Sequence, residues 1–424
     1  MIQKREHDTV LSKELTGLDL DSLRRHINYD TSSIDASKIN LLTYEFNHRN
    51  PSEGFGTLFR IGAEWLDSTQ TKSIVVTPKM QNIDFIEMFM TCLSDNESAD
   101  KFSEIYDIDF ESKPIFAPGL DSVLSPLLVV QFLMCVTRIA SRGLRKGYVA
   151  REENLKKVKG RIDIRRNERK NVIVNHRERV FCRFEEYSAD TPANRYLKQA
   201  LFVSQAMVRE MSEHRSFARL SAMLNSCLSA FQCVSNDNAP INVPNIKQNK
   251  LYKDDTDAVR MASLILQRKA VAIATAASSS YVPVFRMNMA LLFEHYALAQ
   301  LRRIFNREVI YQARGYNGRF KPDFLITKPG FTTIADAKYV PDFDTKPIKG
   351  EYIQQLCGYA RDTKLLSQLG IDCSDETKVP VVPCMILYPT TNRVMSNLKD
   401  WSCHKEPATV QFYKCPIQIP SNQT

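Results

Sequence analysis

Two short runs of β-branched and aromatic residues near the C-terminus predict a pair of neighbouring strands. Residues 324–327 read Phe-Leu-Ile-Thr and residues 331–334 read Phe-Thr-Thr-Ile, a composition that is typical of strands. Between them, residues 328–330 read Lys-Pro-Gly, which favours a turn. We therefore predict an antiparallel hairpin whose side chains alternate between the two faces of a sheet.

Apolar residues at helical spacing predict one helix before this hairpin, and a second helix follows it. The apolar stripe of the first helix consists of Met287, Leu291, Leu298, Leu301 and Phe305. These residues recur at the intervals that place side chains on one helix face. Residues 352–360 predict the second helix, with Gln355 and Tyr359 on one face. Residues 379–388 then predict a buried strand despite their prolines, and this order of elements is that of an α/β core.

The chain divides into three predicted regions. Residues 1–120 mix short strands with polar loops and are expected to form an α+β domain. Residues 121–280 are expected to contain an apolar helix, basic strands and further helices, the longest of which has Thr191 as its N-cap and Pro192 in its first turn. Residues 281–424 are expected to form the α/β core, a mixed sheet flanked by helices.

Two acids and a lysine lie at the ends of the predicted hairpin. Asp323 precedes the first strand, and Asp336 and Lys338 leave the same face of the second strand, about 7 Å apart. Two such carboxylates can hold Mg²⁺, which prefers one or two carboxylates together with substrate phosphate oxygens. Lys338 can orient or help deprotonate the attacking water, or neutralise charge in the transition state. The pattern predicts metal-dependent phosphodiester cleavage, the alternative being a turn-forming Asp and a solvated edge strand.

A helix acid and a helix glutamine extend this candidate site. Glu294 lies within the apolar stripe, where burying an unpaired carboxylate would be costly. A third metal-binding carboxylate explains its position, and pairing with a nearby arginine at the margin of the stripe is the alternative. Gln355 is expected either to hydrogen-bond a phosphate or the nucleophilic water, or to be a plain surface amide. His295 is expected to be an ordinary surface or packed histidine.

These residues resemble the motif of the PD-(D/E)xK nuclease superfamily. The matching positions are Pro322-Asp323, Asp336-Ala337-Lys338, the upstream helix acid Glu294 and the downstream helix glutamine Gln355. More narrowly, the chain is similar to the McrC family from about residue 55 to about residue 390. Further similar segments are residues 74–80, 158–163 and 184–195. The chain departs from the pattern at Tyr352, where an acidic residue is expected.

The resemblance implies a restriction-endonuclease-like core and a role for the chain as the Mg²⁺-dependent DNA endonuclease subunit of a type IV system that acts on 5-methylcytosine. It also implies a partner, a hexameric AAA+ GTPase of the McrB type, which recognises the methylated base while the McrC-like chain cuts. The sequence contains no Gly-x₄-Gly-Lys-Ser/Thr motif, so nucleotide-driven movement would require such a partner.

Charge is unevenly distributed along the chain. Residues 1–120 hold 12 Lys and Arg against 20 Asp and Glu, a net charge of −8, whereas residues 142–183 hold 15 against 5, a net charge of +10. The acidic region is expected to dock a protein partner, because it would repel phosphates. The basic region, interrupted by strand-like residues 172–174, is expected either to track DNA or to be a solvated face. Its candidate DNA contacts are Lys156, Lys157, Arg165, Arg166, Arg169 and Lys170.

Composition sets the remaining expectations. The chain has 424 residues with 43% hydrophobic content, enough for two or three domains with real cores. Neither an apolar run of transmembrane length nor a signal region is recognised in the sequence, so we expect a cytoplasmic protein without a membrane segment. The ten cysteines contain no C-x-x-C pair, which predicts reduced thiols and oxygen ligands for the metal.

Two alternative functions stay open at this point. The chain could be an adaptor that docks on an AAA+ ring and stimulates its hydrolysis, with the nuclease fold retained as a DNA clamp. It could also be a stand-alone repair or replication nuclease, which would cut without nucleotide.

Overall fold

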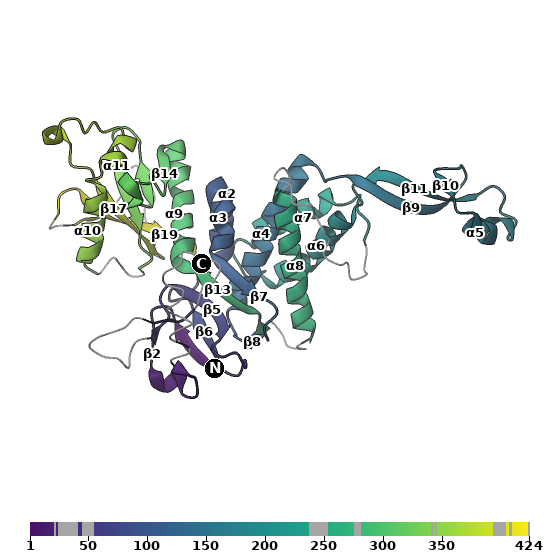
Figure 1. Ribbon diagram of the computed structural model, residues 1–424, viewed down its shortest axis with the longest axis horizontal. Helices are drawn as coiled ribbons and strands as arrows, with labels where there is room; N and C mark the ends of the chain where they lie inside the picture. The colour runs from purple at the N-terminus through teal and green to yellow at the C-terminus, as the bar shows by residue number, and fades with distance from the viewer. Residues whose placement is uncertain are drawn as a thin grey trace. The chain divides into compact units, whose positions relative to one another are not determined.

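A computed structural model describes residues 1–20, 23, 41–44, 55–236, 253–274, 281–340, 343, 346–392, 404–406 and 409–422. The chain forms two compact units (Figure 1). The first unit combines Met1–Leu127 with Val271–Thr424, and the second consists of Leu128–Ala270. The polypeptide therefore leaves the first unit and returns to it.

The first unit contains a five-stranded sheet built from distant parts of the sequence. In spatial order its strands are β1 (Ile2–Arg5), β6 (Ser73–Thr77), β5 (Arg60–Trp65), β13 (Val284–Asn288) and β7 (Tyr106–Asp109). Strand β13 pairs with both β5 and β7. Gly62 allows the close approach of β13, since a Cβ at this position would lie 2.0 Å from the Phe285 carbonyl oxygen. Met287 lies on β13, so its prediction as a helix residue was wrong.

Smaller elements complete this part of the first unit. The short strands are β2 (Thr9–Val10), β3 (Thr43–Tyr44), β4 (Phe55–Gly56), β8 (Ile115–Phe116) and β12 (Tyr281–Val282). The α-helices described in this part are α2 (Phe85–Ser94) and α3 (Asn96–Lys101). Asp84 is the N-cap of α2, and its side chain accepts a hydrogen bond from the Glu87 amide.

A six-stranded mixed sheet forms the C-terminal part of the first unit. In spatial order its strands are β14 (Val309–Tyr311), β15 (Phe324–Ile326), β16 (Thr333–Ala337), β17 (Cys384–Thr390), β19 (Phe412–Gln418) and β18 (His404–Lys405). The predicted hairpin is confirmed, because β15 and β16 pair antiparallel and Gly330 in the turn has a φ of 81°. Strand β17 begins only at Cys384, so Pro380 and Pro383 of the predicted strand precede it.

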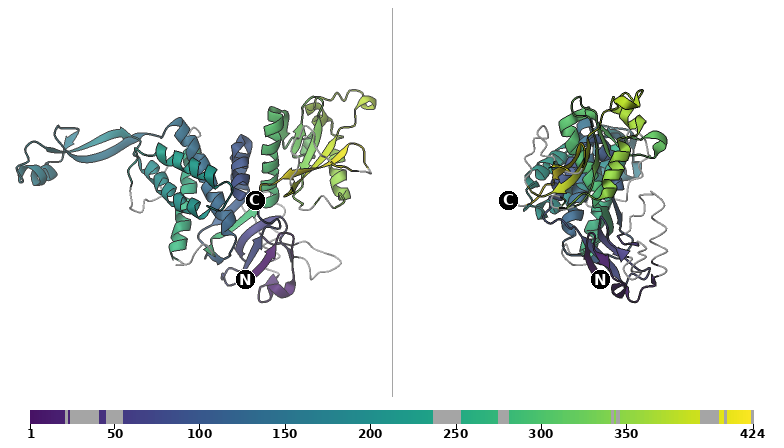
Figure 2. Two further views of the ribbon diagram at one scale, coloured as in Figure 1. Left: turned by 180° about the vertical axis from the view of Figure 1, so that it is seen from behind. Right: turned by 90° about the vertical axis from the view of Figure 1, so that its left-hand side faces the viewer.

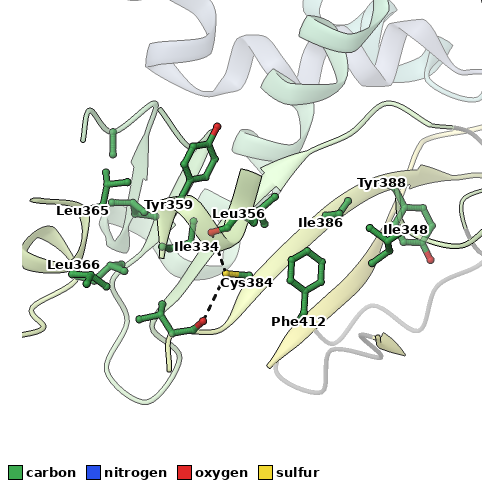
Figure 3. Packing of buried hydrophobic residues seen from close by; sticks show 14 of the residues in the cluster. Ile334, Ile348, Leu356, Tyr359, Leu365, Leu366, Cys384, Ile386, Tyr388 and Phe412 are labelled. Atoms are coloured by element: carbon green, nitrogen blue, oxygen red, sulfur yellow. Dashed lines mark hydrogen bonds between the residues drawn. The ribbon is translucent and has the colours of Figure 1, made fainter. Parts of the chain in front are cut away.

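Helices pack on this mixed sheet. They are α9 (Met289–Phe305), α10 (Gly350–Tyr359) and α11 (Thr363–Gln368). Buried side chains of the strands, among them Ile334 and Ile386, pack with Leu356 of α10 and Leu365 of α11 in one core (Figure 3). Fully burying such an aliphatic side chain contributes about 1.5–3 kcal/mol. This core holds α10 against the sheet, while α9 contacts β14 and β16.

The second unit consists of helices and a long β-hairpin. Its helices are α4 (Asp121–Arg142, which starts in the first unit), α6 (Pro192–Glu210), α7 (Phe217–Ala230) and α8 (Lys253–Ala274, which ends there). Strands β9 (Gly147–Leu155) and β11 (Val180–Ser188) pair along their whole length and extend away from α6 and α7, as Figure 1 and the left view of Figure 2 show. We call the segment from Gly147 to Ser188 the arm.

The tip of the arm differs from its prediction. It contains β10 (Arg161–Ile162), α5 (Ile164–Asn167) and a π-helical turn (Glu168–Val172). Residues 172–174 were predicted as strand-like, but they lie in and after the π-helical turn and are exposed. Three consecutive β-branched residues favour a strand only where a neighbouring strand covers them, and here none pairs with them within the described arm.

Asp190 fixes the arm to the helices of the second unit. Its buried carboxylate accepts hydrogen bonds at 2.8 Å from Arg151 of the arm and Arg195 of α6, and from the Ser235 amide. The predicted N-cap is confirmed, since the Thr191 hydroxyl accepts a hydrogen bond from the Asn194 amide. The Asn-Arg pair at 194–195 is therefore part of this structural junction.

Helix α4 and the cysteines differ from the composition-based expectations. By length and composition, α4 is long and apolar enough to cross a membrane, contrary to the sequence expectation, but 78% of its apolar window is buried inside the protein, as in a core helix. Among the residues that the structure describes, eight cysteines are free thiols, of which Cys233 and Cys357 are exposed. Cys415 is disulfide-bonded, so the expectation of reduced, buried thiols holds only in part.

Candidate active site

The β15–β16 hairpin brings Asp323 and Asp336 together. Phe324 pairs with Ala335, so the next residues outward, Asp323 and Asp336, lie opposite each other on the same face of the sheet. The Asp323 Oδ2 atom accepts a hydrogen bond of 2.7 Å from the Ala337 amide. Asp336 is 2% exposed. The predicted proximity of the two carboxylates is therefore present in the structure.

Lys338 and Gln355 join this pair from the same side. The Lys338 ammonium lies 2.5 Å from Asp336 Oδ2 and donates a hydrogen bond of 3.1 Å to Gln355 Oε1. The Gln355 Nε2 group in turn donates to the Tyr359 hydroxyl at 2.6 Å. The oxygen and the nitrogen of the Gln355 amide thus each form a hydrogen bond within the protein. Gln355 is exposed on α10, with its amide hydrogen-bonded to Lys338 and Tyr359, and its contact with a phosphate or the nucleophilic water stays a prediction.

Glu294 approaches the site from α9, held by two residues that sequence reasoning missed. Its carboxylate accepts hydrogen bonds of 2.8 Å from the Tyr311 hydroxyl and 3.0 Å from Gln312 Nε2. Because Tyr311 pairs with Phe324, it lies on the opposite face of the sheet from Asp336. The alternative prediction, in which an arginine pairs with Glu294, is not what the structure shows, because the partners of Glu294 among the described residues are a tyrosine and a glutamine.

The three carboxylates interact electrostatically. Burial, followed by repulsion from Asp336 and Glu294, raises the pKa of Asp323 well above its ordinary value. Burial also raises the pKa of Glu294, with repulsion from Asp336 adding to the shift and the bonds from Gln312 and Tyr311 opposing it. Burial lowers the pKa of Lys338, but attraction to Asp336 outweighs that effect and leaves it raised. The site therefore brings together carboxyl groups that resist losing their protons and one ammonium group whose charged form is favoured.

The carboxylates offer a partial ligand set for a cation. Within the residues that the structure describes, no group of three or more His, Cys, Asp or Glu side chains is arranged to hold a metal ion. Two carboxylates are, however, what Mg²⁺ commonly takes from a protein, the rest of its shell being water and phosphate oxygens. Asp336 Oδ2 is buried, and its partner among the described residues is the Lys338 ammonium, with which it forms an ion pair. Asp323 and Asp336 thus fit Mg²⁺, and Glu294 as a third ligand stays a prediction.

Tyr339, the residue after Lys338, connects the site to the N-terminal sheet. Its buried hydroxyl donates a hydrogen bond of 3.3 Å to Glu6 Oε2, which also accepts one of 2.9 Å from the Lys79 amide. Burial raises the pKa of Glu6 to about 7. The partners lie 333 residues apart, so periodicity could not have revealed this contact.

The predicted DNA contacts of the arm lie outside this site, in the second unit. Lys156, Lys157, Arg165, Arg169 and Lys170 are exposed, and Arg166 is half-buried. Arg166 forms ion pairs with Glu152 and Asp163. The arm tip also exposes apolar side chains, namely Ile164, Val172, Ile173 and Val174. Exposed apolar patches are typical of protein contacts, so the arm combines two kinds of surface.

These features define an α/β protein with a polar site of two aspartates and a lysine at the end of a hairpin. The family described as "McrBC 5-methylcytosine restriction system component" matches residues 66–364, which is more than half of the chain. The protein belongs to this family. The resemblance found in the sequence is therefore confirmed at the level of the family.

Two solved structures are similar to the chain. One is a half-complex from a tetradecameric assembly of Thermococcus gammatolerans McrB AAA+ hexamers with bound McrC, with 16% identity, a TM-score of 0.41 and coverage of 98% of this chain and 94% of that chain. The other is the T. gammatolerans McrBC complex, with 16% identity, a TM-score of 0.30 and coverage of 71% and 87%. The comparison with curated proteins finds no match.

Proposed function

We propose that this chain is the Mg²⁺-dependent DNA endonuclease subunit of a modification-dependent, McrBC-type restriction system, with a PD-(D/E)xK core. The observation that carries the proposal is the placement of Asp323, Asp336 and Lys338 at one end of the β15–β16 hairpin. Family membership supports it, because restriction of DNA requires phosphodiester cleavage. The substrate proposed is DNA that contains 5-methylcytosine.

In this proposal Asp323 and Asp336 hold the metal ion, which supplies Lewis acidity at the scissile phosphate when bound. The raised pKa of Lys338 keeps its side chain cationic at neutral pH. Lys338 is then suited to stabilising charge that develops on the phosphate oxygens, or to holding the attacking water, rather than to accepting a proton. Gln355 acts as a positioning residue, because its Oε1 atom holds the ammonium group.

The proposed partner is an AAA+ GTPase hexamer of the McrB type. The chain lacks a phosphate-binding P-loop, so nucleotide hydrolysis has to come from another protein. The N-terminal acidic region stays the proposed docking surface, since its net charge of −8 over residues 1–120 favours protein contact over contact with phosphates.

Cleavage of plasmid DNA tests the proposal. The full chain is incubated with and without its AAA+ partner, with methylated or unmethylated plasmid, Mg²⁺, and GTP or ATP. We expect nicks or breaks only with methylated plasmid, partner, nucleotide and Mg²⁺. The variant Asp336→Asn is expected to lower the cleavage rate by at least about 100-fold, since loss of a metal ligand exceeds the usual effect of losing a supporting residue.

Asp372→Asn is the matched control, because Asp372 is an exposed acid in the segment after α11, and its hydrogen-bond partner among the described residues is Ser374. Full cutting by Asp336→Asn would refute the assignment. Stimulation of the partner's GTPase without any Mg²⁺-dependent nicks would instead establish the adaptor function. Cleavage without nucleotide would establish a stand-alone nuclease.

A further inference from the structure

The loop between β14 and β15, residues 313–322, is a basic surface that begins and ends at the candidate site. It contains Arg314, Arg319 and Lys321 and no acidic residue. The Gln312 amide donates a hydrogen bond of 2.8 Å to the Asp323 carbonyl, which closes the loop at its base. The loop therefore runs from Gln312, which bonds to Glu294, to Asp323, and all of its charged residues are cations.

The loop is held in place by Asp362, which precedes α11. The Asp362 carboxylate accepts a hydrogen bond of 2.9 Å from the Tyr316 amide and caps α11 through the Leu365 amide. Gly315 passes so close that a Cβ on it would lie 2.8 Å from Asp362 Oδ2. The Gly315 amide donates to the Phe320 carbonyl at 2.8 Å. This local network ties the loop to the start of α11, and a Cβ at Gly315 would force the Asp362 carboxylate to shift.

The loop packs against the residues that orient Lys338. The ring of Phe320 contacts Tyr359 edge-on, with the ring centroids 5.8 Å apart, and Tyr359 accepts the hydrogen bond from Gln355. At the other end of the loop, the positive charge of Lys321 lowers the pKa of Glu294, opposing the larger effect of burial. The loop thus borders the candidate site.

The cations of the loop are directed to solvent. Arg314, Arg319 and Lys321 are exposed, and none of them forms an ion pair with any other residue in the described part of the chain. Tyr316 is 65% exposed between them. In contrast, two arginines of the arm, Arg166 and Arg183, are both paired with Glu152.

We propose that the β14–β15 loop is a contact surface for the DNA backbone. Arg314, Arg319 and Lys321 contact phosphates, and the Tyr316 hydroxyl can donate a further hydrogen bond to a phosphate oxygen. This inference rests on the proposed function, because it names the surface through which that site engages its substrate. A phosphate that approaches Asp323 and Asp336 is repelled by them, and adjacent unpaired cations offset this repulsion. Arginine, lysine and tyrosine are among the side chains that contact DNA phosphates.

Salt-dependent binding tests the surface without requiring catalysis. Full-length protein carrying Asp336→Asn is titrated onto a labelled DNA duplex at a series of KCl concentrations. The slope of log K against log [salt] is negative, and each lost phosphate contact reduces its magnitude by about 0.9. Arg319→Gln is therefore expected to make the slope shallower by about 0.9, and Arg314→Gln with Arg319→Gln by about 1.8.

Arg307→Gln is the matched control, because Arg307 is an exposed arginine at the opposite end of β14. It removes the same charge and is expected to leave the slope unchanged. Equal slopes for the double variant and the control, or the absence of any duplex binding by the parent protein, would overturn the inference. Melting curves of all variants establish that they are folded.

The same substitutions in the protein with Asp336 intact separate this inference from the proposed function. If the protein cuts DNA but the loop substitutions change neither the slope nor the rate, the loop inference fails and the nuclease assignment stands. If the slopes change as expected and no Mg²⁺-dependent cleavage occurs, the surface stands and the nuclease assignment fails.

Discussion

Glu6 provides a quantitative prediction because it is a buried acid with few compensating partners. It is 1% exposed, and its Oε1 atom has no hydrogen-bond partner within the described residues. Burial raises its pKa from 4.5 to about 7, although the bonds from the Lys79 amide and Tyr339 act in the opposite direction. The amide of Glu6→Gln has nearly the same shape and cannot ionise, so the substitution isolates the cost of the buried charge.

The sign and size of the effect follow from proton linkage. Between pH 4.5 and about 7 the folded protein keeps the Glu6 proton and the unfolded chain releases it, so the free energy of unfolding falls as pH rises through this window. One pKa unit corresponds to 1.36 kcal/mol, which gives a loss of about 3 kcal/mol above the window. We expect Glu6→Gln to match the wild type near pH 4 and to exceed its stability by up to about 3 kcal/mol at pH 8.

Urea denaturation of both proteins from pH 4 to pH 8 measures the effect. The wild-type profile is a sum, because burial also lowers the pKa of His295 to about 4, which weakens the fold toward low pH and opposes the Glu6 trend. The difference between variant and wild type removes this contribution. Glu351→Gln, at an exposed acid, is the control. A difference between Glu6→Gln and wild type that does not change with pH would refute the reasoning.

Two further substitutions test the junctions described above. Asp190→Ala leaves Arg151 and Arg195 without their shared buried carboxylate and is expected to destabilise the second unit by about 3 kcal/mol in denaturant unfolding; an unchanged midpoint would contradict the role of Asp190 in fixing the arm. Gly315→Ala places a Cβ 2.8 Å from Asp362 Oδ2 and is expected to lower the melting temperature, whereas Gly358→Ala meets Phe320 at 3.5 Å, an ordinary contact, and is expected to be neutral or mildly stabilising. Equal melting temperatures for the two alanine variants would show that the loop has room to shift.

Local patterns in the sequence predict the hairpin well. The Lys-Pro-Gly turn, the β-branched strands and the two-residue spacing of Asp336 and Lys338 are all short-range features. They fix the register, and register places Asp323 opposite Asp336. The shared face of Gln355 and Tyr359 is local in the same sense, and their hydrogen bond confirms it.

Contacts between distant segments could not be predicted in this way. The bonds from Tyr311 and Gln312 to Glu294 depend on how α9 packs beside β14, and the Glu6–Tyr339 bond joins two different sheets of the first unit. Strand β13 likewise completes a sheet whose other strands lie in the first 109 residues. Hydrophobic periodicity reports which face of an element is buried, but it does not report the element that covers it.

Binding of Mg²⁺ is the most direct test of the claim that Asp323 and Asp336 form a metal-dependent catalytic site. Calorimetric titration of the full chain with Mg²⁺ is compared with the same titration of Asp336→Asn, which keeps the shape of the side chain and removes its charge. We expect binding by the wild type and a loss of at least about tenfold in affinity for the variant. Equal affinities for the two proteins would contradict the account.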